Sequence, residues 1–244
     1  MKIALIGYGK MGRAIERFAL ERGHRIIARI DSHNPEEWDA DTLRHADVAI
    51  EFTTPSAAVD NYFKAFERHI PLVSGTTAWT DRIDEVRDVC EAHGASFLWS
   101  SNFSIGVNVF MALNRYLAAI MAGLPQYHPA MKEIHHIHKL DHPSGTAITL
   151  AEQIIAADPS IQSWTEDPDA SEGSLVISHE RLGEVPGTHI ISWDSTVDTI
   201  TIEHRAKSRD GFALGAVMAA EWLADHPGYH TIDEMMADML HIKA

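Results

Sequence analysis

The residues best suited to chemistry lie in one segment, 133–146, which reads Glu-Ile-His-His-Ile-His-Lys-Leu-Asp-His-Pro-Ser-Gly-Thr. Histidines 135, 136 and 138 and Lys139 are close together in it. Histidine exchanges protons near neutral pH and lysine carries a positive charge, so this cluster can hold an anion and transfer a proton. Ser144, Gly145 and Thr146 open a predicted helix (146–157), whose unpaired N–H groups also favour negative charge. The segment therefore predicts a site for proton transfer to an anionic substrate.

The backbone that carries this cluster is predicted to be a strand over residues 131–140. Side chains alternate between the faces of a strand, so His135 and Lys139 share one face and His136 and His138 the other. A straight strand would separate His135 from Lys139 by roughly 13 Å, at about 3.3 Å per residue. Because this is too far for both to contact one small molecule, we expect a bend near residues 137–139.

A second motif lies at the N-terminus. The apolar run 2–6 is typical of a buried parallel strand and leads directly into Gly-Tyr-Gly-Lys-Met-Gly, followed by a helix (13–22) and a strand (25–30) that ends at Asp31. In G-x-G-x-x-G the glycines permit a tight turn, close approach of a pyrophosphate and close helix–strand packing, while the acidic residue binds ribose hydroxyls. The residues predicted to bind a dinucleotide here are Gly7, Tyr8, Gly9, Lys10, Met11, Gly12 and Asp31.

The residues after Asp31 bear on which dinucleotide is bound. Ser32 and His33 follow it, and no arginine is beside it. A carboxylate without a neighbouring cation would repel a 2′-phosphate, so NADH is expected to be favoured over NADPH.

The remaining N-terminal elements alternate between strands (47–52, from 71, and 96–99) and helices (about 56–68 and 80–93). Such alternation indicates right-handed βαβ units and an α/β fold with a Rossmann-type, doubly wound parallel sheet. Residues 34–43 are polar and acidic, and we expect a connection outside the core. Ligands of such sheets lie beyond the carboxyl ends of the strands.

A second, α+β domain is predicted after the helix that begins at Val107. Three strand-like runs (174–182, 188–193 and 199–206) are separated by short turns, which favours an antiparallel meander in a mixed, largely antiparallel sheet with the His135 strand. An open sheet has edges and an apolar face to cover, so self-association is expected. Helices 212–224 and 232–242 are expected to follow.

Composition excludes several classes of protein. The formal net charge of −15 argues against a nucleic-acid partner, because phosphate would be repelled. No stretch approaches the roughly 20 apolar residues of a membrane span, and no signal peptide is recognised at the N-terminus. Cys90 is the single cysteine and cannot form an intrachain disulfide. These features predict a cytoplasmic protein.

The run His-His-x-His-Lys-x-Asp-x-Pro-Ser-Gly-Thr-Ala at 135–147 resembles the signature of the 4-hydroxy-tetrahydrodipicolinate reductase (dihydrodipicolinate reductase) family. Phe-Thr-x-Pro at 52–55, Gly-Thr-Thr at 75–77 and Asn-Phe-Ser-x-Gly-Val-Asn at 102–108 resemble further elements of that family. The resemblance implies NAD(P)H-dependent reduction of a cyclic dicarboxylate, 4-hydroxy-tetrahydrodipicolinate, in the diaminopimelate route to lysine. It also implies a homotetramer.

The resemblance assigns roles residue by residue. His135 would be the general acid, Lys139 would supply positive charge to a substrate carboxylate and could assist protonation, and Asp141 would fix the turn. The expected substrate-binding residues are His136, Ser144, Gly145 and Thr146. The expected residues around the nicotinamide half of the cofactor are Gly75, Thr76, Thr77, Ser100, Ser101, Asn102 and Phe103. The nucleotide-binding domain would comprise 1–106 and 210–244, and the substrate-binding and oligomerisation domain 107–209. Arg209, near the hinge, could add positive charge to the site or cap a solvated loop, and its role stays open.

Two other classes of function stay open. His136 and His138 have a spacing found in zinc sites, and Asp141 or His142 could add a third ligand for a metal-dependent hydrolase. Alternatively, the chain could bind NADH as a sensor without turnover. The reductase interpretation is preferred, and no metal is expected.

Overall fold

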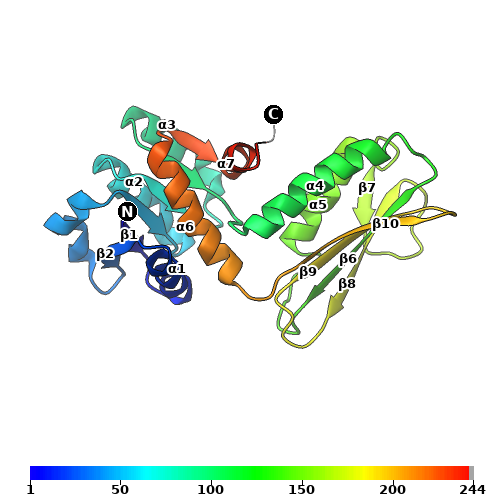
Figure 1. Cartoon of the computed structure of the whole chain (residues 1–244), viewed down its shortest axis with the longest axis horizontal. Helices are drawn as coiled ribbons and strands as arrows, with labels where there is room; N and C mark the ends of the chain where they lie inside the picture. Colours follow the sequence, from blue (N-terminus) through cyan, green and yellow to red (C-terminus); the bar gives the residue numbers. More distant parts are fainter. Residues whose placement is uncertain (242–244) are drawn as a thin grey trace. The chain divides into compact units, whose positions relative to one another are not determined.

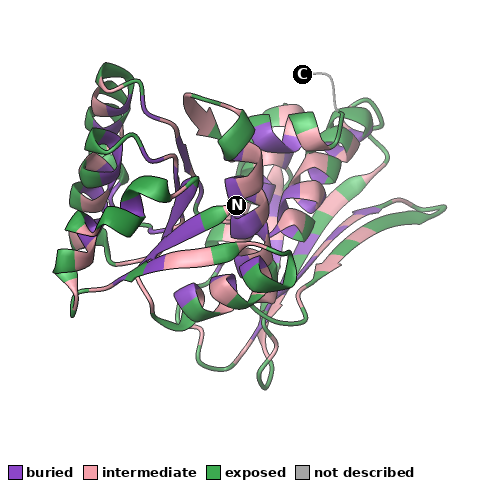
Figure 2. Ribbon diagram, turned by 60° about the vertical axis from the view of Figure 1, so that its left-hand side comes forward, coloured by how far each residue is buried: buried purple, intermediate pink, exposed green. Residues whose placement is uncertain are grey.

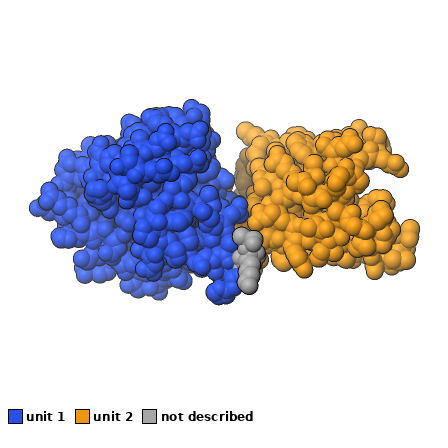
Figure 3. Space-filling model, turned by 90° about the horizontal axis from the view of Figure 1, so that it is seen from above, with its two compact units in different colours: residues 1–105, 210–244 blue, residues 106–209 orange. Residues whose placement is uncertain are grey.

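The computed structural model describes residues 1–241 and forms two compact units. Unit 1 comprises Met1–Ile105 and Asp210–Ala244, and unit 2 comprises Gly106–Arg209 (Figure 3). The chain therefore leaves unit 1 once and returns to it. The domain boundary expected at 106/107 lies one residue beyond this division.

Unit 1 contains a six-stranded sheet in the order β11-β5-β4-β3-β1-β2, with all neighbours parallel. Its strands are β1 (Lys2–Ile6), β2 (Arg25–Ile30), β3 (Val48–Glu51), β4 (Leu72–Ser74), β5 (Phe97–Trp99) and β11 (Tyr229–Thr231). Its helices are α1 (Lys10–Glu21), α2 (Pro55–Glu67), α3 (Ile83–Ala92), α6 (Asp210–Asp225) and α7 (Ile232–Met239), with short 3-10 helices at Pro35–Asp39, Asp41–His45 and Thr80–Arg82. The predicted doubly wound parallel sheet is confirmed.

The central strands of unit 1 (β1, β3, β4 and β5) are buried over almost their whole length because helices cover both faces of the sheet. Ala4 and Ile6 belong to the core under α2 and α3, which contact each other. α1 packs against α6, and α6 contacts β3, β4 and β5. Buried residues accordingly concentrate on the strands and on the inner faces of these helices (Figures 1 and 2). This packing fixes the loops that follow each strand.

Three predictions for unit 1 need correction or extension. Residues 34–43 are not outside the core, since Trp38 and Leu43 are buried in it from two 3-10 helices. The edge strand β11 was not predicted; three residues between two helices give too short a pattern to identify. The last predicted helix ends at Met239, and Ile242, included in that prediction, lies outside the described residues.

Unit 2 contains a five-stranded mixed sheet in the order β10-β9-β6-β8-β7. The strands are β6 (His128–His135), β7 (Ser163–Thr165), β8 (Ser174–Arg181), β9 (Thr188–Asp194) and β10 (Thr199–Arg205). Helices α4 (Ile105–Met121) and α5 (Gly145–Ala157) pack their apolar side chains on one face of this sheet, around Leu150, Ile177 and Trp193 (Figure 1). The predicted mixed sheet is confirmed.

The predicted meander is wrong between β8 and β9, because β6 lies between them. β6 is parallel to β8 and antiparallel to β9. His135 is level with Arg181 at the end of β8, and Ile134 is level with Thr188 at the start of β9. The loop from β8 to β9 therefore crosses the end of β6 beside His135.

Among the described residues, no helix has the length and apolar character needed to cross a membrane.

Candidate active site

The end of β6 carries two buried polar residues, Glu133 and His135. The strand alternates buried and solvent-facing residues, and Glu133 and His135 share the buried face with Met131. Glu133 is fully buried and His135 is 7% exposed. Charged or titratable side chains are rarely buried without partners.

Glu133 is held by groups from three other segments. Its Oε2 accepts a hydrogen bond from the Ser144 amide (3.0 Å), and its Oε1 accepts one from Arg181 Nη2 (3.2 Å). Oε2 also lies 3.5 Å from His135 Nδ1 and 3.9 Å from His189 Nε2. Burial acts to raise the pKa of Glu133, but the hydrogen bonds from Ser144, the electrostatic interaction with His135 and the hydrogen bond from Arg181 hold that pKa below the ordinary value. Glu133 is therefore a buried carboxylate that remains ionised.

His135 is close to this carboxylate but not hydrogen-bonded to it. Burial lowers the pKa of His135, Glu133 acts to raise it, and the charges of Lys139 and Arg181 lower it further. The imidazole is thus neutral at neutral pH, and an added negative charge nearby would favour protonation. A Cβ on Gly187 would lie 3.1 Å from His135 Nε2, so the absence of a side chain at 187 makes room for the ring.

His189, on β9, contributes a second buried imidazole. Its ring centroid is 5.2 Å from that of His135, and its Nε2 is 3.1 Å from Ser144 Oγ. Burial is the main reason that the pKa of His189 falls to about 4, with the charge of His135 acting in the same direction. At neutral pH His189 is an uncharged hydrogen-bonding group behind the start of α5.

The predicted bend after His135 is present. The strand ends there, and the Lys139 amide donates to the His136 carbonyl (3.1 Å) to close a turn. Arg181 holds the turn in place by donating to the carbonyls of Lys139 (3.3 Å) and Asp141 (2.8 Å). The strand predicted over 131–140 therefore stops five residues early, because the loop after β8 ends the pairing.

The charges in the turn are paired with each other. Lys139 Nζ donates to both oxygens of Asp141 (2.8 and 2.7 Å), and this contact is the main cause of the lowered pKa of Asp141. His136 is half-buried, whereas His138 is exposed and lies 3.1 Å from Glu184. Of the residues in the zinc alternative, His138, Asp141 and His142 thus contact three different partners, Glu184, Lys139 and Glu166.

The start of α5 lies next to Glu133. Ser144 caps this helix, because its Oγ accepts from the Ala147 amide (3.2 Å). The Ser144 amide and hydroxyl are therefore occupied by Glu133, Ala147 and His189. Gly145 has open space where a Cβ would be, so an anion can approach the backbone there.

Unit 1 has the geometry expected for a dinucleotide at its glycine motif. A Cβ on Gly7 (φ +90°) would lie 2.0 Å from the Phe52 carbonyl oxygen, and one on Gly12 would lie 2.3 Å from the Gly7 oxygen. Nothing lies within 4 Å of the Cβ position of Gly9. Gly7 and Gly12 are thus needed for packing, while Gly9 leaves space for a ligand beside the uncapped N-terminus of α1.

Two cavities of about 440 and 330 Å³ share Gly9, Phe52 and Thr53. The larger extends to Asp31 and also contacts Lys64. The smaller is lined by several predicted cofactor residues: Gly9, Lys10, Met11, Gly75, Thr76 and Thr77. The structure therefore brings the glycine motif, the end of β2 and the loop after β4 around adjoining space.

Asp31 occupies the end of that space. Its carboxylate accepts from the Ser32 amide (2.6 Å) and the Tyr8 amide (3.3 Å), and the Ser32 amide is the main cause of its lowered pKa. Asp31 is thus ionised and attached to the glycine loop. Lys64 was not predicted here, because α2 brings it from a distant part of the sequence.

Glu51, at the end of β3, was also missed. It is fully buried, accepts from Ser74 Oγ (2.6 Å) and Thr76 Oγ1 (3.0 Å), and contacts the hydroxyl and amide of Thr53. Burial raises its pKa in spite of these donors. Glu51 joins the loops after β3 and β4, and its only signal in the sequence is a carboxylate in an apolar strand.

Residues Ser100–Phe103 follow β5 but line neither of the two cavities. Ser100 Oγ donates to the Asn102 carbonyl (2.9 Å), and Ser101 is exposed. Phe103 is buried, and a Cβ on Gly215 of α6 would lie 1.7 Å from its carbonyl oxygen. The segment is therefore fixed tightly at the same edge of the sheet.

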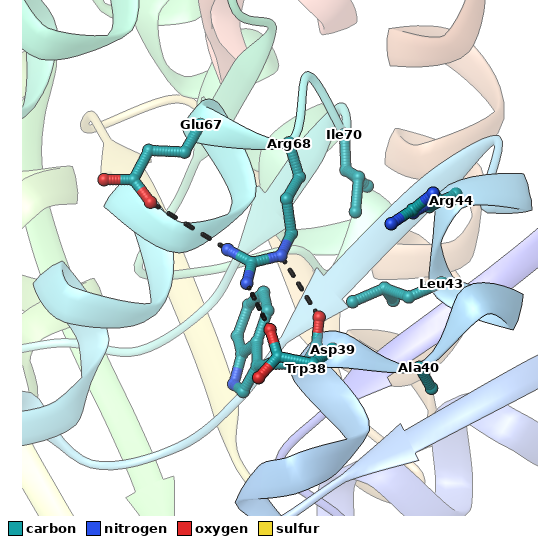
Figure 4. A pocket seen from close by; sticks show the side chains of 8 residues that line it. All are labelled: Trp38, Asp39, Ala40, Leu43, Arg44, Glu67, Arg68 and Ile70. Atoms are coloured by element: carbon teal, nitrogen blue, oxygen red, sulfur yellow. Dashed lines mark hydrogen bonds and ion pairs between the residues drawn. The ribbon is translucent and has the colours of Figure 1, made fainter.

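A third cavity in unit 1, of about 560 Å³, contains none of the predicted site residues (Figure 4). Arg68 lies across it and donates to the Trp38 carbonyl (3.1 Å) and to Asp39 (2.9 Å). The charge of Arg68 is therefore satisfied within the chain.

Comparison with known proteins covers both units. A family model described as "Dihydrodipicolinate reductase, N-terminus" matches residues 1–103, and one described as "Dihydrodipicolinate reductase, C-terminus" matches 106–236. The chain is 46% identical to 4-hydroxy-tetrahydrodipicolinate reductase of Christiangramia forsetii, over 98% of this chain and 99% of that protein. It is 35% identical to the protein of the same name from Archaeoglobus fulgidus, over 97% and 100%.

Among solved structures, the fold is similar to that of dipicolinate-bound dihydrodipicolinate reductase from Paenisporosarcina sp. TG-14. The TM-score is 0.75 at 20% identity, over 95% of this chain and 97% of that chain.

Proposed function

The chain belongs to the dihydrodipicolinate reductase family, and from this premise we propose how its residues carry out the reaction. The protein is an oxidoreductase that reduces 4-hydroxy-tetrahydrodipicolinate (dihydrodipicolinate) to tetrahydrodipicolinate in the diaminopimelate route to lysine, at the expense of a reduced pyridine nucleotide. The observation that supports the assignment of its chemistry is the buried pair of Glu133 and His135 at the end of β6.

His135 supplies the proton. In the free protein its pKa is lowered, so the ring is largely neutral at neutral pH. A bound dicarboxylate adds negative charge, which favours the imidazolium form that a general acid requires. Glu133, ionised and 3.5 Å away, stabilises the same form. His135 is therefore protonated when substrate binds.

The two substrate carboxylates bind at positive groups of unit 2. One is held by the N–H groups of Gly145 and Thr146 at the start of α5, where the space beside Gly145 is open. The other carboxylate replaces Asp141 as the partner of the Lys139 ammonium. His136 contacts the substrate from the same turn. Ser144 orients the helix start, since its own polar groups are already bonded.

A nicotinamide dinucleotide fits the glycine motif of unit 1. The start of α1 presents the backbone N–H groups of Lys10, Met11 and Gly12. Asp31 can accept hydrogen bonds from the ribose hydroxyls. Glu51 keeps Thr53 and Thr76 in place around the smaller cavity. The nicotinamide end is assigned to Ser100, Ser101, Asn102 and Phe103 because they follow β5 at the same edge of the sheet, outside the two cavities. The reduced nicotinamide supplies the hydride when it is bound.

NADH is the preferred cofactor in this proposal. The ionised carboxylate of Asp31 would repel a 2′-phosphate. The positive charge of Lys64, which lines the same cavity, offsets part of this repulsion. We therefore expect NADPH to be accepted with lower affinity.

A homotetramer formed through unit 2 is part of the proposal. Helices α4 and α5 cover one face of its sheet, β10 is an edge strand, and Val197 (81% exposed) and Ile200 (40%) leave apolar surface there. Light scattering on the purified protein tests the subunit number, and a monomer would refute it. The biosynthetic role of the relatives also suggests a cytoplasmic enzyme.

The function is tested with substrate generated from aspartate semialdehyde and pyruvate, by following the oxidation of NADH and of NADPH. We expect oxidation that depends on both precursors. Binding of NADH without any such oxidation would indicate a sensor, and absence of both would refute the assignment.

A further inference from the structure

A second group of histidines in unit 2 is not used by the reaction. His142 precedes α5, Glu166 follows β7, and His179 lies on β8. Glu166 Oε1 lies 2.9 Å from His142 Nδ1 and 2.8 Å from His179 Nδ1. Three segments of the chain thus bring two imidazole nitrogens to one carboxylate oxygen.

We propose that His142, Glu166 and His179 form a binding site for a divalent transition-metal ion, with Zn²⁺ the best match. Two imidazoles and one carboxylate form a His₂Glu ligand set, which leaves a fourth position for water. Mg²⁺ and Ca²⁺ prefer oxygen ligands, and two of the three donors here are nitrogen. The site departs from the expectation that the chain holds no metal.

The distances are close to those of such a site. Zinc–nitrogen and zinc–oxygen bonds of about 2.0–2.2 Å place tetrahedral ligands roughly 3.3 Å apart. The three donor atoms lie within 4.8 Å of one another, and the two nitrogen–oxygen distances are 2.8 and 2.9 Å. Each contact therefore needs to open by only about half an ångström to admit an ion.

The two rings must also turn. They are stacked, with centroids 4.3 Å apart and planes 19° apart, so their lone pairs do not yet converge. The side chains of His142 and His179 are 49% and 34% exposed, which leaves room for this rotation. Glu166 is 30% exposed and contacts both rings. The protein's net negative charge of −15 further favours cation binding.

The site would influence the substrate loop without taking part in the chemistry. His142 lies between Asp141, the partner of Lys139, and Ser144, the cap of α5. An ion shared with Glu166 and His179 would tie this loop to β7 and β8. Because a histidine nitrogen must be free of its proton to bind a metal, affinity should fall in acid.

The test is a titration of the full chain, freed of any tag and stripped with a chelator, with Co²⁺ followed by visible absorption and then with Zn²⁺ by calorimetry. We expect one ion per chain and tetrahedral-type cobalt bands that zinc abolishes. His142→Gln and His179→Gln should each weaken binding by more than about tenfold, since even outer-shell partners of metal ligands are worth 10–100-fold. Glu166→Gln is a third variant, should either histidine variant fail to fold.

The matched control is His138→Gln. His138 is also exposed and paired with a single carboxylate, Glu184, at 3.1 Å. This variant should bind cobalt and zinc as the unmodified chain does. The proposal is refuted if no ion binds, if binding survives in the His142, His179 and Glu166 variants, or if it is lost in the His138 variant.

Discussion

Replacing Glu133 by glutamine tests how the buried carboxylate acts on His135. The change keeps the size of the side chain and an acceptor oxygen, but it removes the negative charge 3.5 Å from His135 Nδ1. Two unit charges at that distance interact by roughly 5 kcal/mol at an effective dielectric constant of about 20. Arg181 shares the carboxylate, so only part of this acts on His135. We expect the pKa of His135 to fall by at least about one unit, equivalent to about 1.4 kcal/mol.

The assay is the pH dependence of kcat/KM, which reports the ionisation of the free enzyme. An acid that must be protonated gives a rate that decreases as the pH rises through its pKa. Since the variant has the lower His135 pKa, its descending limb should move to lower pH by that amount. The matched control is Glu180→Gln on β8, a half-buried carboxylate paired with Lys132, which should leave the limb in place.

Stability must be measured in parallel, because removing one partner of a buried ion pair costs about 3–5 kcal/mol. Urea unfolding at neutral pH measures this loss and shows whether the variant is folded under the conditions of the kinetic assay. A descending limb that stays in place in folded Glu133→Gln protein, or that moves to higher pH, would refute the stabilisation of the His135 imidazolium by Glu133.

Three further predictions follow from single residues. Lys139→Met should raise KM and lower kcat, because the charge serves the bound substrate and the transition state; an unchanged KM would argue against the contact. Lys64→Met should weaken NADPH binding more than NADH binding in a fluorescence titration, and equal losses would contradict a role at the 2′-position. For His189, the folded pKa of about 4 lies below the unfolded value of about 6.5, so the unfolded chain binds more protons between those pH values and stability is lost as the pH falls. The loss reaches about 3 kcal/mol near pH 4 in urea unfolding. His189→Asn should lose less stability between neutral pH and pH 4. A loss equal to that of the unmodified chain would refute the origin of the effect in His189.

Local patterns predicted much of unit 1. Gly7, Gly9 and Gly12 could be assigned separate roles because a strand, a tight turn and a helix start impose distinct steric demands. The same strand–turn–helix–strand pattern predicted that the second strand ends at Asp31. The strand β11 was out of reach, since residues 229–231 join the sheet only because α6 returns the chain to it.

The candidate site in unit 2 was predicted only in part, for a similar reason. The motif around His135 and Lys139 is continuous in sequence and was recognised, as was the bend between them. Arg181 and His189 approach Glu133 from two other strands, and their order in the sheet was predicted incorrectly. A run of strands does not reveal which of them are neighbours, so contacts between strands had to come from the structure.

The most direct test of the central claim is the turnover of His135→Gln, with substrate generated from aspartate semialdehyde and pyruvate and NADH as reductant. Loss of a positioned general acid should lower kcat by about 10²–10⁴, while the KM for the substrate changes much less. His138→Gln, three residues along the same motif, should keep its turnover. Near-normal kcat in the folded His135 variant would contradict the account.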